Sequence, residues 1–179
     1  PMFHANGWTF VWTVTAAGAT HICLRKCEPR AVCELMKTEQ VTVLCSAPTV
    51  LIALANAPEN IRRLAPKGIH VITAGAPPAA STIQRLEEDL GWTITHVYGL
   101  TETAPFITVC EARTEHAPLS ISERAAIKAR QGVELITSGE LRVVDTRGND
   151  VPNDGDTQGE IIARGNVVMT GYYNDPEAT

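Results

Sequence analysis

The chain has 179 residues, 44% of them hydrophobic and 20% charged, and its formal net charge at pH 7 is −5. This composition is typical of a globular protein with a buried core, and it excludes a disordered tail or a collagen-like repeat. The net negative charge argues against a general nucleic-acid-binding protein, and no apolar run reaches the roughly 20 residues that a membrane span requires.

The first part of the chain predicts helices and short strands in alternation. Residues 7–17 are apolar on nearly all sides and predict a buried helix that ends at Gly18. Residues 20–24 form a short β-rich run, residues 30–38 predict an amphipathic helix, and residues 41–45 predict the next strand.

The same alternation continues through the middle of the chain. Residues 48–55 predict an apolar helix and residues 69–73 a strand, and a helix over residues 78–90 and a strand over residues 92–98 follow. The helix over residues 78–90 turns three apolar side chains inward, namely Ile83, Leu86 and Leu90. Strands that alternate with helices of this length predict an α/β fold, in which helices cover both faces of a parallel sheet.

The pattern changes in the last third of the chain. A polar helix is predicted over residues 122–130, and two strands over residues 139–145 and 159–163 flank a stretch rich in turn residues. Strands joined by such a loop predict a small antiparallel β unit. We therefore expect an α/β parallel-sheet subdomain over residues 1–131 and a β subdomain over residues 132–179.

The number and spacing of the cysteines predict free thiols and not the ligands of a metal cluster. Their number is odd, and no C-x-x-C pair occurs among Cys23, Cys27, Cys33, Cys45 and Cys110. We expect small, buried or half-buried free thiols in a reducing cytoplasm.

The segment H-V-Y-G-L-T-E-T over residues 96–103 carries the strongest chemical signal. A strand that ends at Tyr98 brings the residues after it to the carboxyl edge of the sheet, where open α/β sheets bind ligands, and Gly99 permits a sharp turn there. A Thr101 hydroxyl can donate to a phosphate oxygen, Glu102 is a hard oxygen ligand suited to Mg²⁺, and the Tyr98 ring offers a flat surface to a base. The alternative interpretation is a capping box that opens the next helix.

A second strand end has the same character. Residues 73–78 read T-A-G-A-P-P, so small residues follow the predicted strand and would allow an aromatic base to approach the backbone closely. The alternative is a plain tight turn into the helix that begins at Pro78.

These segments resemble the adenylate-forming superfamily, and specifically its fatty acyl-CoA synthetases. The resemblance extends to P-M-F-H-A-N-G-W over residues 1–8, K-A-R-Q-G-V over residues 128–133 and G-E-I-I-A-R-G-N-V-V-M-T-G-Y-Y-N-D-P-E-A-T over residues 159–179. It covers essentially the whole chain and implies part of the large N-terminal domain of an ATP-dependent fatty acid–CoA ligase. Such an enzyme converts a carboxylate into an acyl-adenylate and then transfers the acyl group to coenzyme A.

The resemblance also implies a role for each matching residue. The adenine contacts would come from five residues of the two strand ends: Gly75, Ala76, Pro77, Tyr98 and Gly99. Thr101 would bind the α-phosphate, and Glu102 would hold the Mg²⁺ of ATP.

The acyl group would be bound by residues near the start of the chain. The resemblance places His4 near the acyl carboxylate and makes Trp8 the aromatic residue that gates a fatty acyl tunnel, which implies a medium or long aliphatic chain. The alternatives are a histidine at a helix start and a core aromatic residue.

Parts that the family needs for catalysis do not occur in these residues. They lack the Ser/Thr/Gly-rich phosphate loop, the ribose-binding Asp and the catalytic Lys of a C-terminal domain. We therefore expect a piece of a longer protein that is inactive by itself; its partners would be a carboxylic acid, ATP and coenzyme A, and a homodimer is a further expectation. The alternatives are a truncated, non-catalytic nucleotide-binding or interaction module and an α/β oxidoreductase, which the lack of G-x-G-x-x-G disfavours.

Overall fold

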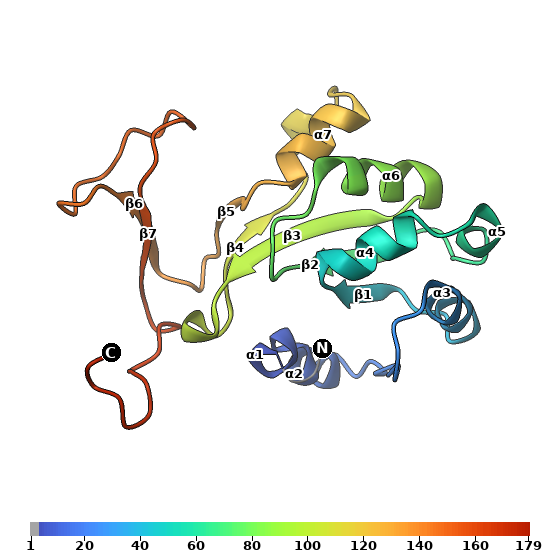
Figure 1. Cartoon of the computed structure of the whole chain (residues 1–179), viewed down its shortest axis with the longest axis horizontal. Coiled ribbons are helices and arrows are strands. Elements are labelled where there is room, and N and C mark those ends of the chain that lie inside the picture. Colours follow the sequence, from blue (N-terminus) through green and yellow to red (C-terminus); the bar gives the residue numbers. More distant parts are fainter. Residues whose placement is uncertain (1–3) are drawn as a thin grey trace.

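A five-stranded sheet forms the centre of the computed structural model, which describes residues 4–179 (Figure 1). The strands are arranged in chain order. Three of them pair in parallel, namely β1 (Val43–Ser46), β2 (His70–Thr73) and β3 (Thr93–Gly99). Two more pair antiparallel beyond β3, namely β4 (Phe106–Cys110) and β5 (Val133–Glu134).

The sequence predictions locate the parallel part of this sheet and miss the antiparallel part. The strands expected over residues 41–45, 69–73 and 92–98 are confirmed as β1, β2 and β3, with small shifts at their ends. Neither β4 nor β5 was expected, and β5 has only two residues. Because β5 pairs with β4, the five-stranded sheet extends past residue 131, and the division of the chain at that residue stays a proposal.

Most helices contribute to one core on one face of the sheet. Five helices follow this pattern: α3 (Pro29–Thr38), α4 (Pro48–Ala55), α5 (Glu59–Arg62), α6 (Ala80–Leu90) and α7 (Ile121–Lys128). Their apolar side chains meet Leu44, Val71 and Ile94 from β1, β2 and β3. The expected helices in these regions are confirmed, and Ile83, Leu86 and Leu90 lie inward with at most 6% of their surface exposed.

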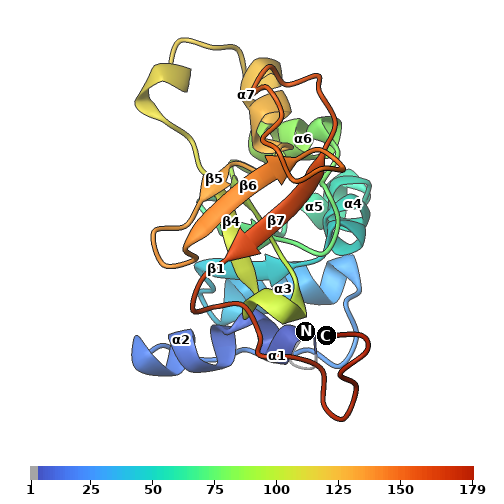
Figure 2. The same ribbon diagram turned by 90° about the vertical axis from the view of Figure 1, so that its left-hand side faces the viewer.

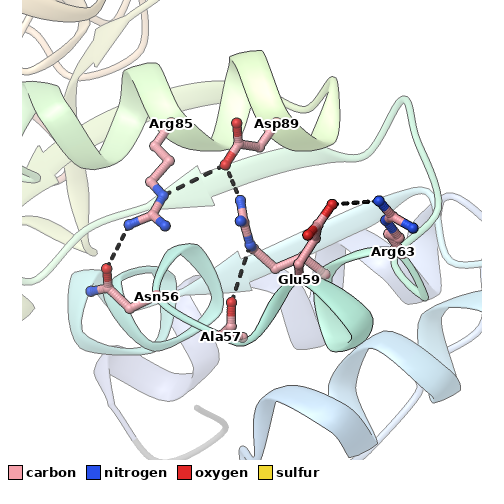
Figure 3. Close-up of polar contacts among 7 residues, drawn as sticks. Asn56, Ala57, Glu59, Arg63, Arg85 and Asp89 are labelled. Carbon is pink, nitrogen blue, oxygen red and sulfur yellow. Dashed lines mark hydrogen bonds and ion pairs between the residues drawn. The ribbon is translucent and has the colours of Figure 1, made fainter.

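Polar contacts also hold these helices together (Figure 3). The Arg62 guanidinium donates to Asp89 of α6 and, through Nε, to the Ala57 carbonyl at 3.1 Å. Arg85 of α6 donates to Asn56 Oδ1 at 2.8 Å. Side chains of α6 are therefore linked to α5 and to the segment that joins α4 to α5.

The opposite face carries a smaller cluster, which includes Trp8, Ala74 and Val97. The helices α1 (Ala5–Trp8) and α2 (Phe10–Ala16) lie on this side of the sheet (Figure 1), and Trp8 of α1 and Phe10 of α2 belong to the cluster.

Two expectations for the beginning of the chain are wrong. The buried helix expected over residues 7–17 is instead two short helices separated by Thr9, whose φ is 64°, and none of the residues of α2 is buried. Trp12 is 66% exposed, because no second layer of the described chain packs on the outer side of α2. Residues 20–24 form no strand and are exposed; a β-rich run becomes a strand only where a neighbour pairs with its backbone.

The small antiparallel unit is confirmed (Figure 2). It consists of β6 (Glu140–Val144) and β7 (Glu160–Arg164), which pair along their whole length. Within the described residues, no helix is long and apolar enough to cross a membrane.

Candidate functional site

The turn after β3 depends on a glycine. A Cβ atom at Gly99 would lie 1.6 Å from the Pro105 carbonyl oxygen, so no other residue fits there without moving the backbone. The register between β3 and β4 shifts at this point, between Tyr98 and Gly99. Close packing of the two strands therefore fixes where the chain leaves the sheet edge.

Thr103, which sequence reasoning did not select, closes the same turn. The residue is 5% exposed, and its Oγ1 accepts the Leu100 N–H at 2.9 Å and lies 2.9 Å from the Pro105 carbonyl oxygen. The short 3₁₀ helix η1 (Thr101–Thr103) is thereby held in place, with Thr101 exposed on it and Glu102 partly exposed. A hydroxyl three residues after Leu100 was the signal that could have identified Thr103.

The alternative interpretation, a capping box that opens the next helix, is confirmed in part: Thr103 Oγ1 accepts the Leu100 N–H at the start of η1, and Glu102 is not the capping residue. The three residues of η1 are followed by the strand β4. The carboxylate of Glu102 accepts the hydroxyl of Tyr172 at 2.5 Å, and its main-chain carbonyl accepts the Met169 N–H at 2.8 Å.

The Tyr172 contact also favours the charged form of Glu102. The donated hydroxyl lowers the pKa of the Glu102 carboxyl, and a hydrogen bond from the backbone lowers it further. The carboxylate is therefore ionised at neutral pH. The same contact raises the pKa of the Tyr172 phenol, which stays protonated and able to donate.

The segment after β2 reaches the neighbouring position on the sheet edge, because β2 and β3 are adjacent parallel strands. Ala74 is buried, whereas Gly75, Ala76 and Pro77 are exposed. Gly75 has a φ of 90° and open space where a Cβ would lie, so the backbone conformation requires the glycine and the space in front of it is free. The helix α6 begins only at Ala80.

A cavity of about 220 Å³ brings most of the expected site residues together. Ten of the described residues line it: His4, Trp8, Ala74, Gly75, Gly99, Leu100, Thr101, Glu102, Pro105 and Phe106. Six of them were selected from the sequence, whereas Ala76 and Pro77 lie outside the lining.

The two residues expected to bind the acyl group stand at one wall of this cavity. Trp8 is 3% exposed, and its ring meets Phe106 edge to face with centroids 6.1 Å apart. His4 stands at the start of α1. Trp8 therefore both packs in the core and lines the cavity. His4 both stands at a helix start and lines the cavity.

A second cavity of about 330 Å³ also adjoins η1. Its lining joins the end of β3 to β7 and to the segment after it: Tyr98, Leu100, Glu102, Thr103, Ile107, Ile161, Ala163, Val168, Met169, Thr170, Gly171 and Thr179. Tyr98 is therefore in a different cavity from Gly75. Among the described residues, only Leu100 and Glu102 line both cavities.

The oxygen-bearing side chains of the first cavity could hold a cation only together with a bound ligand such as a nucleotide. Among the described residues, no group of three or more His, Cys, Asp or Glu side chains could bind a metal ion by itself. Thr101 and Glu102 supply one hydroxyl and one ionised carboxylate to the same cavity. Mg²⁺ is commonly held in this way, by one or two carboxylates plus the phosphates of a nucleotide.

Comparison with known proteins identifies related enzymes. The chain is 43% identical over 182 residues to a 2-methylpropanoate–CoA ligase of Humulus lupulus, and 43% identical over 180 residues to a peroxisomal acetate/butyrate–CoA ligase of Arabidopsis thaliana. These matches cover 100% and 99% of the chain and 32% of each relative, so the chain spans about a third of their length.

The fold of the chain also matches part of a larger solved structure. The N-terminal domain of FACL13 from Mycobacterium tuberculosis superposes with a TM-score of 0.78 at 23% identity, over 100% of the chain and 42% of that structure. The AMP-binding enzyme family matches residues 1–173, which is nearly all of the sequence. The chain therefore belongs to the AMP-binding enzyme family.

Proposed function

We propose that the protein in which this chain occurs is an ATP-dependent acyl-CoA ligase, and that the chain supplies part of its nucleotide and acyl sites. The observation that carries the proposal is the cavity of about 220 Å³, where residues from two strand ends, Gly75, Gly99, Thr101 and Glu102, meet His4 and Trp8. The 43% identity to two CoA ligases supports it.

The first half-reaction joins the acid to AMP. A carboxylate oxygen attacks the α-phosphorus of ATP, an acyl-adenylate forms and pyrophosphate leaves. The exposed Thr101 hydroxyl would donate to an α-phosphate oxygen and so stabilise the charge that develops there. In the second half-reaction the coenzyme A thiol attacks the acyl carbon, the thioester forms and AMP leaves.

The nucleotide base would be held by backbone and ring surfaces. The exposed Gly75, Ala76 and Pro77 stand at one strand end, and Tyr98 and Gly99 stand at the neighbouring one. Since Tyr98 lines the second cavity, the base would lie where the two cavities approach each other at Leu100 and Glu102.

The ionised Glu102 fits the role of ligand to the Mg²⁺ that accompanies ATP. Such an ion supplies charge neutralisation between the phosphates. The Glu102 carboxylate would orient the triphosphate so that the α-phosphorus faces the acyl carboxylate.

The acyl group would be aliphatic, and its length would be limited by Trp8. The indole is fixed in the core by Phe106 and forms a wall of the cavity. The two relatives are named for short acids, 2-methylpropanoate and acetate or butyrate. Both observations favour a short chain over the medium or long chain expected from the sequence, and a series of acids with two to sixteen carbons tests this.

Location in the cell is a separate proposal. All five cysteines are free, as a reducing compartment allows, and the cytoplasm remains our proposal. The Arabidopsis relative is named peroxisomal, so fluorescent tagging of the full-length protein has two compartments to distinguish.

The function is tested with the full-length protein in which the chain occurs. With ATP, Mg²⁺, coenzyme A and an aliphatic acid, it should release AMP and pyrophosphate only when the acid is present. The 179-residue chain alone should release at least about a hundredfold less, because these residues lack the phosphate loop and the catalytic Lys that the family resemblance implies. A full-length protein that binds ATP and makes no acyl-adenylate would be a nucleotide-binding module and would contradict the proposal.

A further inference from the structure

Two adjacent tyrosines near the end of the chain have different surroundings. Tyr173 is 94% exposed, whereas Tyr172 is 45% exposed and donates its hydroxyl to Glu102 Oε1 at 2.5 Å. The two partners of this bond are 70 residues apart in the sequence. The contact thus connects the segment after β7 with the turn after β3.

A second bond joins the same two segments. The Met169 N–H donates to the main-chain carbonyl of Glu102 at 2.8 Å. Glu102 is therefore held at both its backbone and its side chain by residues 169 and 172. The backbone bond fixes the position of the residue, and the phenol fixes the direction of the carboxylate.

The segment that carries Tyr172 is itself braced. The Tyr172 N–H donates to Thr179 Oγ1 at 2.9 Å, and the Thr179 hydroxyl donates to the Asp175 carbonyl at 2.8 Å. Gly171 packs closely on this loop, since a Cβ there would lie 2.6 Å from Thr179 Cγ2. The phenol is thus presented to Glu102 by a closed turn.

The orientation of Glu102 has consequences for both cavities, because this residue lines both of them. A partly exposed glutamate has three rotatable side-chain bonds, and each unrestrained rotation weakens its contribution to a bound cation. A hydrogen bond to one carboxylate oxygen removes part of this freedom and leaves lone pairs of the carboxylate available.

We propose that Tyr172 is a positioning residue, which holds the Glu102 carboxylate in the orientation that binds Mg²⁺ with ATP. The proposal rests on the proposed function and adds to it a residue from the segment after β7. Tyr172 acts only through Glu102. Hydrogen-bond partners of metal-ligating carboxylates generally contribute tenfold or more to metal affinity.

The test compares Tyr172→Phe with the matched control Tyr173→Phe in the full-length protein. Calorimetry measures the dissociation constant for a non-hydrolysable ATP analogue over a range of Mg²⁺ concentrations, so the readout does not depend on turnover. Tyr172→Phe should weaken Mg²⁺-dependent binding about tenfold. Tyr173→Phe should stay within about twofold of the wild type, because its hydroxyl is in solvent.

A double-mutant cycle separates positioning from a merely structural role. If Tyr172 acts through Glu102, adding Tyr172→Phe to Glu102→Gln should weaken binding far less than the roughly tenfold expected in the wild-type background. Equal weakening in both backgrounds would overturn the inference. Thermal unfolding of each variant, and amide exchange at Met169, show whether the segment stays folded on Glu102.

The remaining outcomes distinguish this inference from the proposed function. If Glu102→Gln weakens Mg²⁺-dependent binding and Tyr172→Phe behaves like Tyr173→Phe, the inference fails and the proposed function stands. If Glu102→Gln also binds like the wild type, the inference and the metal role of Glu102 both fail.

Discussion

The Lys128 ammonium of α7 donates to the carboxylate of Glu87 on α6, and the same carboxylate oxygen accepts the Ile94 N–H of β3 at 3.1 Å. Lys128 is 7% exposed, so this ion pair lies inside the layer between the helices and the sheet. One acceptor therefore joins two helices and the strand that ends at Gly99.

We predict that removing one partner of this pair is much more harmful than replacing both. Lys128→Met should lower the free energy of unfolding by about 3 kcal/mol, because it leaves a carboxylate that is only 13% exposed without its cation. The double variant Glu87→Gln, Lys128→Met should recover most of this loss, since the amide that replaces the Glu87 carboxylate would keep an acceptor for Ile94 without a charge. Chemical unfolding of the three proteins measures both effects, and equal losses in the single and double variants would contradict the assignment.

A second prediction concerns the turn at the site. Gly99→Ala should lower the free energy of unfolding by roughly 3 kcal/mol and abolish ATP binding, because its Cβ would meet the Pro105 carbonyl and push β4 away from β3. Gly148→Ala is the matched control. Gly148 has a φ of 82° but no atom within 4 Å of the added Cβ, so only backbone strain of about 1 kcal/mol is expected. Similar effects of the two changes would show that the Gly99 contact is not restrictive.

We predict that His96 of β3 makes the stability of the protein depend on pH. Burial lowers the pKa of His96 below its ordinary 6.5, and the hydrogen bond from its Nδ1 to the Arg130 carbonyl, at 2.8 Å, only partly offsets this. The unfolded chain therefore binds the proton more readily than the folded chain. The free energy of unfolding should be highest above about pH 6.5. It should fall as the pH drops through the ordinary pKa of His96 toward the lowered one.

The His96 prediction is checked by unfolding curves between about pH 8 and pH 5. His96→Gln should remove most of the change in stability over this range, whereas His70→Gln, at an exposed position on β2, should leave it as in the wild type. The opposite assignment, in which His70→Gln flattens the curve, would place the titrating group elsewhere.

Local spacing was enough to predict the layers of the larger unit. Ile83, Leu86 and Leu90 recur at helical intervals, and their burial follows from that spacing. Gly75 and Gly99 meet in one cavity because their strands are parallel neighbours, which the alternation of strands and helices implies.

Relationships between distant segments could not be predicted in this way. The run F-I-T-V-C of β4 becomes a strand only because the turn at Gly99 brings it back along β3. Nothing near Tyr172 in the sequence indicates a bond to a residue 70 positions away. The all-round apolar character of residues 10–16 suits burial, yet Trp12 is exposed, because periodicity does not say whether a partner layer exists.

The last prediction separates the two half-reactions of the full-length protein at Glu102. Glu102→Gln keeps the shape of the side chain and removes its charge, so adenylation should slow by about a hundredfold, or about 3 kcal/mol. Transfer to coenzyme A from a supplied acyl-adenylate involves no departure of pyrophosphate, so it should change much less. Glu111→Gln, at an exposed position just after β4, is the control and should leave both steps unchanged.

If Glu102 serves only the contact with Tyr172, its substitution should cost about 1 kcal/mol of stability and leave both half-reactions nearly intact. Equal slowing of both steps, measured as pyrophosphate release and thioester formation beside a melting curve, would refute the role of Glu102 as the ligand of Mg²⁺.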